Sequence, residues 1–366
     1  MVEVAHVVGA RPNFVKMAPV FAALAARGVG QVLVHTGQHY GDQLSGSLFR
    51  DLGLPAPNIN LGVGSGSHAS QTASLMTGLE RTFVELQPAL VVVYGDVNST
   101  LAAALVAAKL PMAIAHVEAG LRSFDMTMPE EINRRLCDVV CDLLFATSPE
   151  AMTNLANEGV DLRRVHFVGN PMIDSLLLHL DELDPARIQS GLGLPARYAL
   201  ATVHRPSNVD TAESAGEVVA GLSAVAALVP VVLPLHPRGR PKLNAAGLEQ
   251  VPGISVLEPL GYVDFLSLLK GASLVITDSG GVQEEATVLG IPCLTCRDTT
   301  ERPVTISHGT NRLVSWSELS FVARELLARE PNRATGRPPL WDGHAGERIA
   351  QVIHEWLGAA APRRAE

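Results

Sequence analysis

The sequence predicts an α/β fold built from two doubly wound halves, and two observations carry this prediction. Short runs of valine, isoleucine and leucine alternate with alanine- and leucine-rich stretches along most of the 366 residues. These runs are continuously apolar, which is typical of parallel strands that are buried on both faces of a sheet. Strands that alternate with helices in this way form doubly wound sheets, and a chain of this length suits about two domains.

The expected strands fall into two series. The first series comprises Val4–Val8, Gln31–Thr36, Leu90–Tyr94, Met112–Val117 and Leu143–Thr147. The second series comprises Tyr198–Val203, Val231–His236, Ser255–Leu257, Leu274–Thr277 and Ile291–Thr295. Helices are expected between the strands, among them Ala69–Glu85, Ser99–Lys109 and Pro129–Val140.

The two series are separated at Leu176–Pro195, where proline and glycine turns interrupt the pattern. We therefore expect one domain over residues 1–176 and a second domain over residues 177–345. Residues 346–366 are expected to add one more amphipathic helix and a frayed tail.

The composition excludes several classes of protein. With 47% hydrophobic and 18% charged residues, the chain is not expected to be disordered. Its formal net charge of −9 argues against a nucleic-acid partner held by bulk positive charge. The apolar stretches are too short to cross a membrane, and Met1–Val8 has the pattern of a strand rather than of a secretion signal. We expect a cytoplasmic protein without a nucleic-acid or membrane partner.

The four cysteines lie in apolar segments, as expected for reduced thiols in a cytosol. Cys293 and Cys296 have the spacing of a metal-binding or redox pair. However, they lie in a run that is expected to be a strand, where residues three apart point to opposite faces. Cys137 and Cys141 are helix neighbours that packing explains. We therefore expect no metal site.

Polar residues follow the expected strands of the first half, at the edge where parallel α/β sheets bind ligands. After the first strand, Gly9–Pro12 opens a helix with Arg11 at its mouth, which is a natural contact for an anion. Asp96 follows a second strand and Glu118 ends a third. Two carboxylates at adjacent strand ends suit proton transfer on both faces of a substrate, although Asp96 could equally stabilise its turn.

The helix that begins at Pro129 allows two interpretations. Glu130 and Arg134 are four residues apart, so the helix could direct an acid and a guanidinium toward a ligand. Alternatively, Thr127 and Glu130 fit the spacing of a capping box, in which both side chains only close the first turn.

The second half carries further polar strand ends. His204 and Arg205 follow one expected strand, and His236 ends another. A lone histidine is usually structural, but an adjacent histidine and arginine at this edge favour a ligand site.

The strongest single motif is the turn that contains Ser279, Gly280 and Gly281. It joins a strand to a helix, so its backbone amides and the helix dipole can bind a diphosphate. Glu285, one turn further along, could then reach a ribose diol. Arg302 follows the next strand and adds a positive charge.

Taken together, these motifs resemble the non-hydrolysing UDP-N-acetylglucosamine 2-epimerase family, from Val7 to about Val314. The matching segments of the first half are Gly9–Pro12, Thr36–His39, Tyr94–Asp96, His116–Arg122, Met128–Arg134 and Gly169–Pro171. Those of the second half are His204-Arg205, Ser279–Glu285 and Arg297–Pro303.

The resemblance implies a GT-B-like fold, with two Rossmann-like domains, an active site in the interdomain cleft, and the last helix packed back on the N-terminal domain. It implies reversible conversion of UDP-GlcNAc to UDP-ManNAc by anti elimination of UDP to 2-acetamidoglucal and re-addition, without metal or cofactor. It also implies a homodimer and a role in cell-envelope polysaccharide biosynthesis.

The resemblance assigns roles residue by residue. The catalytic positions are Asp96, Glu118, Glu130 and His204. The UDP-binding positions are Arg11, Lys16, Arg134, Arg205, His236, Leu260, Phe265, Ser279, Gly280, Gly281, Glu285 and Arg302. Of these, Leu260 and Phe265 are expected to contact uracil and Glu285 the ribose.

The chain departs from the family pattern at a second UDP-GlcNAc site, which activates well-studied members. Gln38, His39 and Gln71 remain as a possible remnant, but Tyr40, Gly41 and Ser70 replace its other polar groups. We therefore expect no activation by a second UDP-GlcNAc.

Four alternatives remain open. They are a GT-B glycosyltransferase, a hydrolysing 2-epimerase that releases free ManNAc, a 2-epimerase of a modified sugar such as a diacetamido uronate, and a silent nucleotide-binding protein.

Overall fold

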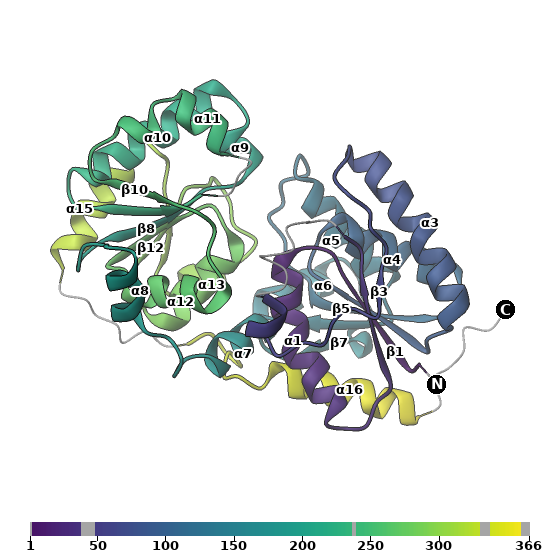
Figure 1. Cartoon of the computed structure of the whole chain (residues 1–366). Helices are drawn as coiled ribbons and strands as arrows, with labels where there is room; N and C mark the ends of the chain where they lie inside the picture. Colours follow the sequence, from purple (N-terminus) through teal and green to yellow (C-terminus); the bar gives the residue numbers. More distant parts are fainter. Residues whose placement is uncertain (1, 38–47, 236–238, 330–336, 360–366) are drawn as a thin grey trace. The chain divides into compact units, whose positions relative to one another are not determined.

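The computed structural model describes residues 2–37, 48–235, 239–329 and 337–359 of the chain (Figure 1). The described chain divides into two compact units. Unit 1 comprises Met1–Leu178 and Pro339–Glu366, and unit 2 comprises His179–Pro338. Each unit is a parallel sheet covered by helices on both faces (Figure 1).

Unit 1 contains a 7-stranded parallel sheet in the order β3-β2-β1-β4-β5-β6-β7. Its strands are β1 (Val4–Val8), β2 (Gln31–His35), β3 (Ile59–Asn60), β4 (Leu90–Tyr94), β5 (Ala113–Ala119), β6 (Leu143–Ala146) and β7 (Val165–Phe167). The order of connection reverses between β1 and β4, and ligands of doubly wound sheets bind at the carboxyl ends of strands at such a switch point.

Helices cover both faces of this sheet. They are α1 (Arg11–Ala25), α3 (His68–Leu86), α4 (Asn98–Lys109), α5 (Pro129–Val140), α6 (Pro149–Asn157), α7 (Pro171–Leu178) and α16 (Ala345–Gly358). The core cluster on one face packs the alanine-rich α4 against residues such as Val91 and Phe83, all of them buried. Small side chains on α4 bring that helix close to the sheet, because alanine adds little bulk between the two layers.

Unit 2 contains a 6-stranded parallel sheet in the order β10-β9-β8-β11-β12-β13, which is again a doubly wound order. Its strands are β8 (Ala199–Thr202), β9 (Val231–Pro234), β10 (Ile254–Leu257), β11 (Leu274–Thr277), β12 (Cys293–Thr295) and β13 (Asn311–Leu313). Its helices are α8 (Pro185–Gly191), α9 (Pro206–Val209), α10 (Ala212–Ala226), α11 (Arg240–Ala245), α12 (Tyr262–Gly271), α13 (Gly280–Leu289), α14 (Val304–Ser307) and α15 (Leu319–Ala328).

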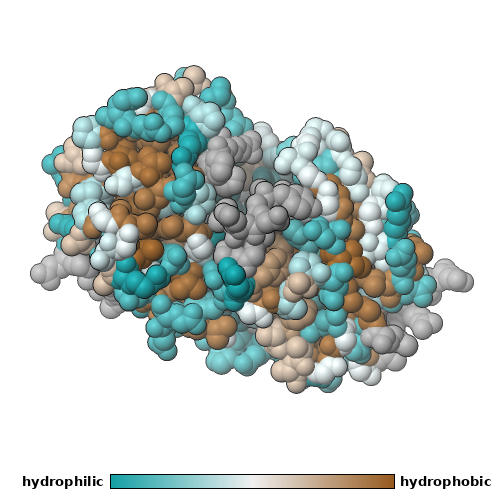
Figure 2. Space-filling view, viewed as in Figure 1, coloured by the Kyte–Doolittle hydropathy of each residue, from teal (hydrophilic) through white to brown (hydrophobic). Residues whose placement is uncertain are grey.

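The edge strand β10 of unit 2 is half-buried along its whole length. Figure 2 shows hydrophobic surface on the visible face of this unit, around the position of β10. A strand of four residues offers few free backbone groups to another chain, which is one way that proteins protect sheet edges.

The C-terminal segment returns to unit 1, where α16 packs against α1. Trp341 is buried at 1% exposure, and its Nε1 donates to the carbonyl of Thr147 at 2.9 Å. A side chain at Gly346 would place its Cβ 2.7 Å from the backbone of Pro19, so only glycine permits this close approach. The sequence placed this return at residue 346, whereas the chain re-enters unit 1 at Pro339.

The expected two-domain α/β fold is confirmed, and every expected strand lies on an observed one. Val4–Val8, Leu90–Tyr94 and Leu274–Thr277 have the expected bounds, and the other expected strands differ by one or two residues at their ends. The sequence missed β3, β7 and β13, which are two or three residues long and partly polar. None of the helices in the described part of the chain is long and apolar enough to span a membrane.

Candidate active site

Glu118 lies at the switch-point edge of unit 1 and has an unusual backbone conformation. Its φ angle is +75°, and the pairing of β5 with β6 shifts register between Val117 and Ala119. A left-handed conformation of a residue other than glycine costs about 1–3 kcal/mol and is frequent at active sites. The side chain is buried, and its carboxylate forms an ion pair with Lys16 from α1. The contact with Lys16 therefore fixes the position of the Glu118 carboxylate.

A glycine beside this ion pair leaves room for it. Gly95 follows β4 with a φ of +63°, and a Cβ there would lie 3.2 Å from Glu118 and 3.3 Å from Lys16 and Asn13. The side chain of Asn13 donates to the carbonyl of Tyr94 and accepts from the amide of Ala10 at 3.2 Å. Asn13 thus links the ends of β1 and β4, and Gly95 keeps the space between them free.

Asp96 is held by α5. Nε of Arg134 donates to its carboxylate at 2.9 Å, and Nη2 lies 2.8 Å from the same carboxylate. Asn133 donates from Nδ2 to the Asp96 carbonyl at 2.8 Å. The Asp96 side chain is 25% exposed, whereas that of Arg134 is 2% exposed and also binds Glu131 at 2.5 Å. Arg134 therefore lies between two carboxylates, and its expected contact with UDP stays a prediction.

The start of α5 excludes the capping-box interpretation of Glu130. The N-cap is Met128, and the hydroxyl of Thr127 donates to Asp125 at 2.6 Å. Glu131 is the third helical residue and is fully buried, and it accepts from the amides of Ser123 and Phe124 at 2.9 and 3.1 Å. Thus Glu131 ties the preceding loop to the helix, while the half-buried Glu130 has no part in the cap.

In unit 2, Asp278 at the end of β11 binds the turn that follows β8. Its carboxylate accepts from the amides of His204 and Arg205 at 3.0 and 2.9 Å, and it lies 2.9 Å from His204 Nδ1. Asn208 donates to it at 2.9 Å. Burial by itself would raise the pKa of Asp278, but His204, Asn208 and the amide of Arg205 lower it to about 2. Asp278 is therefore an anion that orients His204, whose ring is 51% exposed.

Three arginines gather beside this turn around two buried glutamates. Glu301 binds Arg205 at 3.3 Å, Arg297 at 2.7 Å and also Arg302. The Nε of Arg302 lies 2.8 Å from Glu284. Three positive charges facing two negative ones leave this cluster with one net positive charge.

Gly280 begins α13 directly against the arginine cluster. A Cβ at this position would overlap the guanidinium of Arg302 and lie 2.8 Å from Glu301 Oε1. Ser279, the N-cap, is half-buried, and its side chain makes no capping hydrogen bond. The first amides of α13 therefore adjoin the arginines, an arrangement that suits an anion such as phosphate.

The family model for "UDP-N-acetylglucosamine 2-epimerase" matches residues 22–354. The chain belongs to the UDP-N-acetylglucosamine 2-epimerase family. A relative of that name from Methanocaldococcus jannaschii is 38% identical, over 95% of this chain and 97% of its own length. A crystal structure of UDP-GlcNAc 2-epimerase from the same organism, in complex with UDP-GlcNAc and UDP, is 37% identical, with a TM-score of 0.91, and covers 96% of this chain and 99% of that one.

A second kind of relative has another sugar in its name. The UDP-2,3-diacetamido-2,3-dideoxy-D-glucuronate 2-epimerase of Pseudomonas aeruginosa is 39% identical, over 97% of this chain and 99% of its own length. The family that the sequence resembled is thus confirmed, while members at similar identity carry the names of different sugar substrates.

The structure describes some of the remaining predicted site residues and not others. Glu285 is buried on α13, whereas Phe265 on α12 and Leu260 just before it are half-buried. Gln71 is buried on α3, where it accepts from Asn98 at 2.8 Å and donates to the Gly64 carbonyl at 3.1 Å. Three predicted positions lie outside the described residues: His236, Gln38 and His39.

The cysteines do not form a metal site among the residues that the structure describes. All four are buried free thiols. Burial raises the pKa of Cys293 to about 12 and that of Cys296 well above its ordinary value. Thiols in this state are poor nucleophiles and poor metal ligands.

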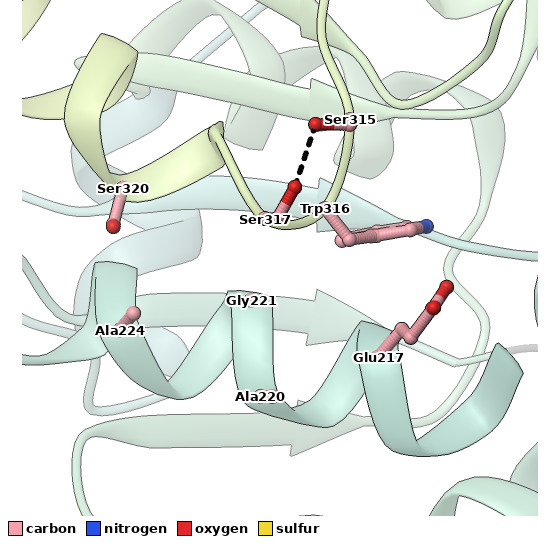
Figure 3. A pocket seen from close by; sticks show the side chains of 8 residues that line it. All are labelled: Glu217, Ala220, Gly221, Ala224, Ser315, Trp316, Ser317 and Ser320. Carbon is pink, nitrogen blue, oxygen red and sulfur yellow. Dashed lines mark hydrogen bonds between the residues drawn. The ribbon is translucent and has the colours of Figure 1, made fainter. Parts of the chain in front are cut away.

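A groove elsewhere in unit 2 is connected to the His204 turn. It has a volume of about 370 Å³ and lies between α10 and the segment around Trp316 (Figure 3). A Cβ at Gly221 would lie 3.0 Å from Trp316, so this contact also depends on glycine. The Nε1 of Trp316 donates to Asn208 at 3.1 Å, and Asn208 in turn binds Asp278. The groove is lined by none of the predicted site residues, and only Trp316 of its lining is connected to the His204 turn by these hydrogen bonds.

Sequence reasoning missed several residues that organise the two sites. They are Asn13, Glu131, Asn133, Asp138, Asn208, Asp278, Glu284, Arg297 and Glu301. A signal was available for Asp278, which directly precedes the Ser-Gly-Gly turn. The others are contributed by neighbouring elements, and nothing in their local sequence indicates which side chain they meet.

Proposed function

We propose that the chain catalyses reversible epimerisation at C2 of UDP-N-acetylglucosamine, giving UDP-N-acetylmannosamine. The observation that carries the proposal is the pair of fixed carboxylates, Asp96 and Glu118, at adjacent strand ends of unit 1. Epimerisation needs a base and an acid on opposite faces of the sugar, and two carboxylates held in place can serve both roles.

The reaction begins with removal of the C2 proton while the C1–O bond to UDP breaks. Because C2 is not next to a carbonyl, this proton becomes acidic only as C1 gains oxocarbenium character. Asp96, Glu118 and the half-buried Glu130 are the proposed proton-transfer groups. The intermediate, 2-acetamidoglucal, then accepts a proton at C2 from the opposite face while UDP adds again at C1.

Departure of UDP requires positive charge close to its diphosphate. Arg205, Arg302 and the amides that begin α13 supply this in unit 2, and His204 is held next to them by Asp278. Arg11, Lys16, Glu285, Leu260 and Phe265 keep the binding roles that the family resemblance gives them. Proton transfer is therefore assigned to unit 1, and UDP binding chiefly to unit 2.

Incubation with UDP-GlcNAc in D₂O tests the proposal. Proton NMR should show UDP-ManNAc, with deuterium at C2 of both epimers, and slow release of UDP and 2-acetamidoglucal. Epimerisation without exchange at C2 would exclude the elimination mechanism. Free ManNAc as the main product would place the enzyme in the hydrolysing class.

A second candidate substrate is a UDP-2,3-diacetamido uronate. The 39% identity to the Pseudomonas aeruginosa relative favours it as much as the 38% identity to the archaeal one favours UDP-GlcNAc. Measurement of kcat/KM for both sugars under the same conditions decides between them, because the true substrate should exceed the other by several orders of magnitude.

We further propose that the enzyme works in the cytoplasm as a homodimer and supplies sugar for cell-envelope polysaccharide. Its four buried free thiols suit a reducing compartment. Helix α5 exposes Ile132, Leu136 and Val139, an apolar stripe that a second copy would cover. Light scattering should give twice the chain mass, and Leu136→Glu should reduce it. A deletion strain should lack N-acetylmannosamine in its envelope polysaccharide.

A further inference from the structure

Helix α5 has its polar side chains inside and several apolar side chains outside. Glu131, Arg134 and Asp138 are buried at spacings of three and four residues, which places them on one face. Leu136 and Val139 are 44% and 68% exposed. Burying three charged groups is expensive unless each meets a partner, so this face must bind something specific in the interior of unit 1.

The partners of Asp138 surround Glu118 on both sides along the chain. One carboxylate oxygen lies 2.7 Å from Nδ1 of His116, two residues before Glu118. The other accepts from the amide of Gly120 at 3.1 Å, two residues after it, and lies 2.7 Å from Arg122 Nη2. Asp138 therefore binds both ends of the segment from His116 to Gly120. The central residue of this segment, Glu118, has the left-handed backbone conformation.

The Asp138 carboxylate is also connected, through His116, to the turn that carries Asp96. Nε2 of His116 lies 2.8 Å from the carbonyl of Gly95, the residue before Asp96. Both nitrogens of the fully buried ring thus have an oxygen within hydrogen-bond distance. His116 therefore joins Asp138 to the turn that carries Asp96, and Arg134 on the same helix face holds the Asp96 side chain.

Arg122 completes this network. Its guanidinium is fully buried and also binds Glu158 at 2.9 and 2.7 Å. Burial by itself would raise the pKa of Asp138, but His116 and Arg122 hold it below its ordinary value. Asp138 is therefore a permanent anion whose contacts are all made inside unit 1.

We infer that Asp138 is a positioning residue for the epimerisation: it sets the distance between the two proton-transfer carboxylates by anchoring both of their turns to α5. The inference rests on the proposed function, since it assumes that Asp96 and Glu118 transfer protons. Asp138 itself touches neither group and does not meet the substrate.

The test compares Asp138→Asn with Asp142→Asn. Asp142 lies just after the end of α5 and accepts from the amide of Ile114 at 2.9 Å, near the start of the same strand β5. It is therefore a matched carboxylate-to-backbone bond at the end of β5 away from Glu118. Each variant is assayed as the full chain with UDP-GlcNAc, and UDP binding is measured by calorimetry.

The deciding measurement is the amount of 2-acetamidoglucal released per epimer formed. This ratio does not depend on how much of the sample is folded. If the second carboxylate is displaced, protonation of the glycal slows and more of it escapes. For Asp138→Asn we expect the ratio to rise about tenfold and kcat to fall by up to about a hundredfold, with UDP affinity unchanged. Asp142→Asn should match the wild type in both.

Either of two results would overturn the inference. One is a lower kcat for Asp138→Asn with an unchanged glycal ratio, which indicates only a loss of folded enzyme. The other is an equal change in Asp142→Asn. If Asp138→Asn does not fold, His116→Gln breaks the same connection at its other end, and its ratio decides in the same way. A wild-type enzyme that shows no exchange at C2 would refute the proposed function itself.

Discussion

The two units share the order of six strands, to which β7 is added in unit 1, and they differ in the charges at their switch-point edges. In unit 1 the groups proposed to face the ligand are carboxylates, and buried cations hold them: Lys16 for Glu118 and Arg134 for Asp96. In unit 2 the groups proposed to face the ligand are basic side chains, and buried carboxylates hold them: Asp278 for His204 and Glu301 for Arg205. The fold supplies the edge, and the residues after each strand decide what that edge binds.

This difference predicts that variants will separate by unit. Changes at the carboxylates of unit 1 should slow proton transfer and leave UDP bound. Changes at the cations of unit 2 should weaken UDP binding. A unit 1 carboxylate variant that loses UDP binding, or a unit 2 variant that binds UDP normally, would show that the two edges do not have separate roles.

The largest effect is expected for Glu118→Gln. The amide keeps the shape of the side chain but cannot transfer a proton, so kcat should fall by about 10²–10⁴-fold, with the Kd for UDP within about threefold of the wild type. Rates follow from NMR of the epimer mixture, and Kd from calorimetry. Glu80→Gln, an exposed carboxylate on α3, is the control. Loss of UDP binding in Glu118→Gln would contradict the division.

Asp96→Asn and Glu130→Gln extend this test. Both should resemble Glu118→Gln if all three carboxylates transfer protons. Near-normal turnover in Glu130→Gln would remove that residue from the catalytic set, since the structure has already excluded its role in a helix cap.

Next in size is Arg205→Ala. A charge-assisted contact contributes roughly 1.5–3 kcal/mol, so the Kd for UDP should rise by about 10–150-fold. Arg240→Ala is the matched control, because Arg240 pairs with a 75% exposed Glu258 and such surface pairs contribute little. Titration calorimetry measures both. An Arg205→Ala enzyme with normal UDP affinity would remove this arginine from the UDP site.

A smaller effect is expected for Gly280→Ala. The added methyl would push the Arg302 guanidinium away from Glu301 and Glu284, so UDP should bind several-fold more weakly. Gly216→Ala on α10 is the matched substitution, because a Cβ there meets nothing within 4 Å. It should instead raise the free energy of unfolding by about 0.4–1 kcal/mol. Equal behaviour of the two variants would mean that the Arg302 contact is unimportant.

The smallest effect concerns stability and its pH dependence. Burial raises the pKa of Asp174 to about 6, although the amide of Gly346 donates to it at 2.6 Å. Because the folded pKa exceeds the unfolded one, the folded chain binds the proton more tightly, so stability falls as pH rises from about 4 to about 6. At pH 8 the charged form costs about 1–3 kcal/mol.

Asp174→Asn should flatten this part of the stability curve and stabilise the protein at pH 8, without changing kcat. Urea unfolding between pH 4 and pH 8 measures the slope. Asp161→Asn, at an exposed position, should leave the slope above about pH 5 as it is, because hydrogen bonds from Arg163 lower the pKa of Asp161 to about 2. A slope that persists in Asp174→Asn would assign it to another group.

Much of the fold could be predicted because continuous apolar runs mark buried parallel strands wherever they are four or five residues long. Strands such as β13 escaped because Asn311–Leu313 carries two polar residues in three. Asp96 and His204 could also be placed from the sequence at the ends of strands, since each follows a strand closely; their roles stay predictions. The residues that hold them in position could not be predicted from the sequence. Asp138, for example, lies 18 residues from Gly120 and 22 from His116. Only the packing of α5 on β5 brings these residues together.

Glu130 shows how a local pattern can mislead. Thr127 and Glu130 have the spacing of a capping box, but the buried Glu131 takes the third helical position because its carboxylate satisfies two amides of the preceding loop. The free energy of satisfying buried donors outweighs a cap on the surface. The spacing of Thr127 and Glu130 does not show which of these two free energies is larger.

The return of the chain to unit 1 also affects how the protein is made. Helix α16 is translated long after α1, yet it packs against α1. Synthesis at about 5–20 residues per second leaves that face of α1 uncovered for roughly 10–30 s while residues 179–338 are translated. The nascent N-terminal half is therefore a natural client for a chaperone, and truncation before Ala345 should produce aggregation rather than a shorter enzyme.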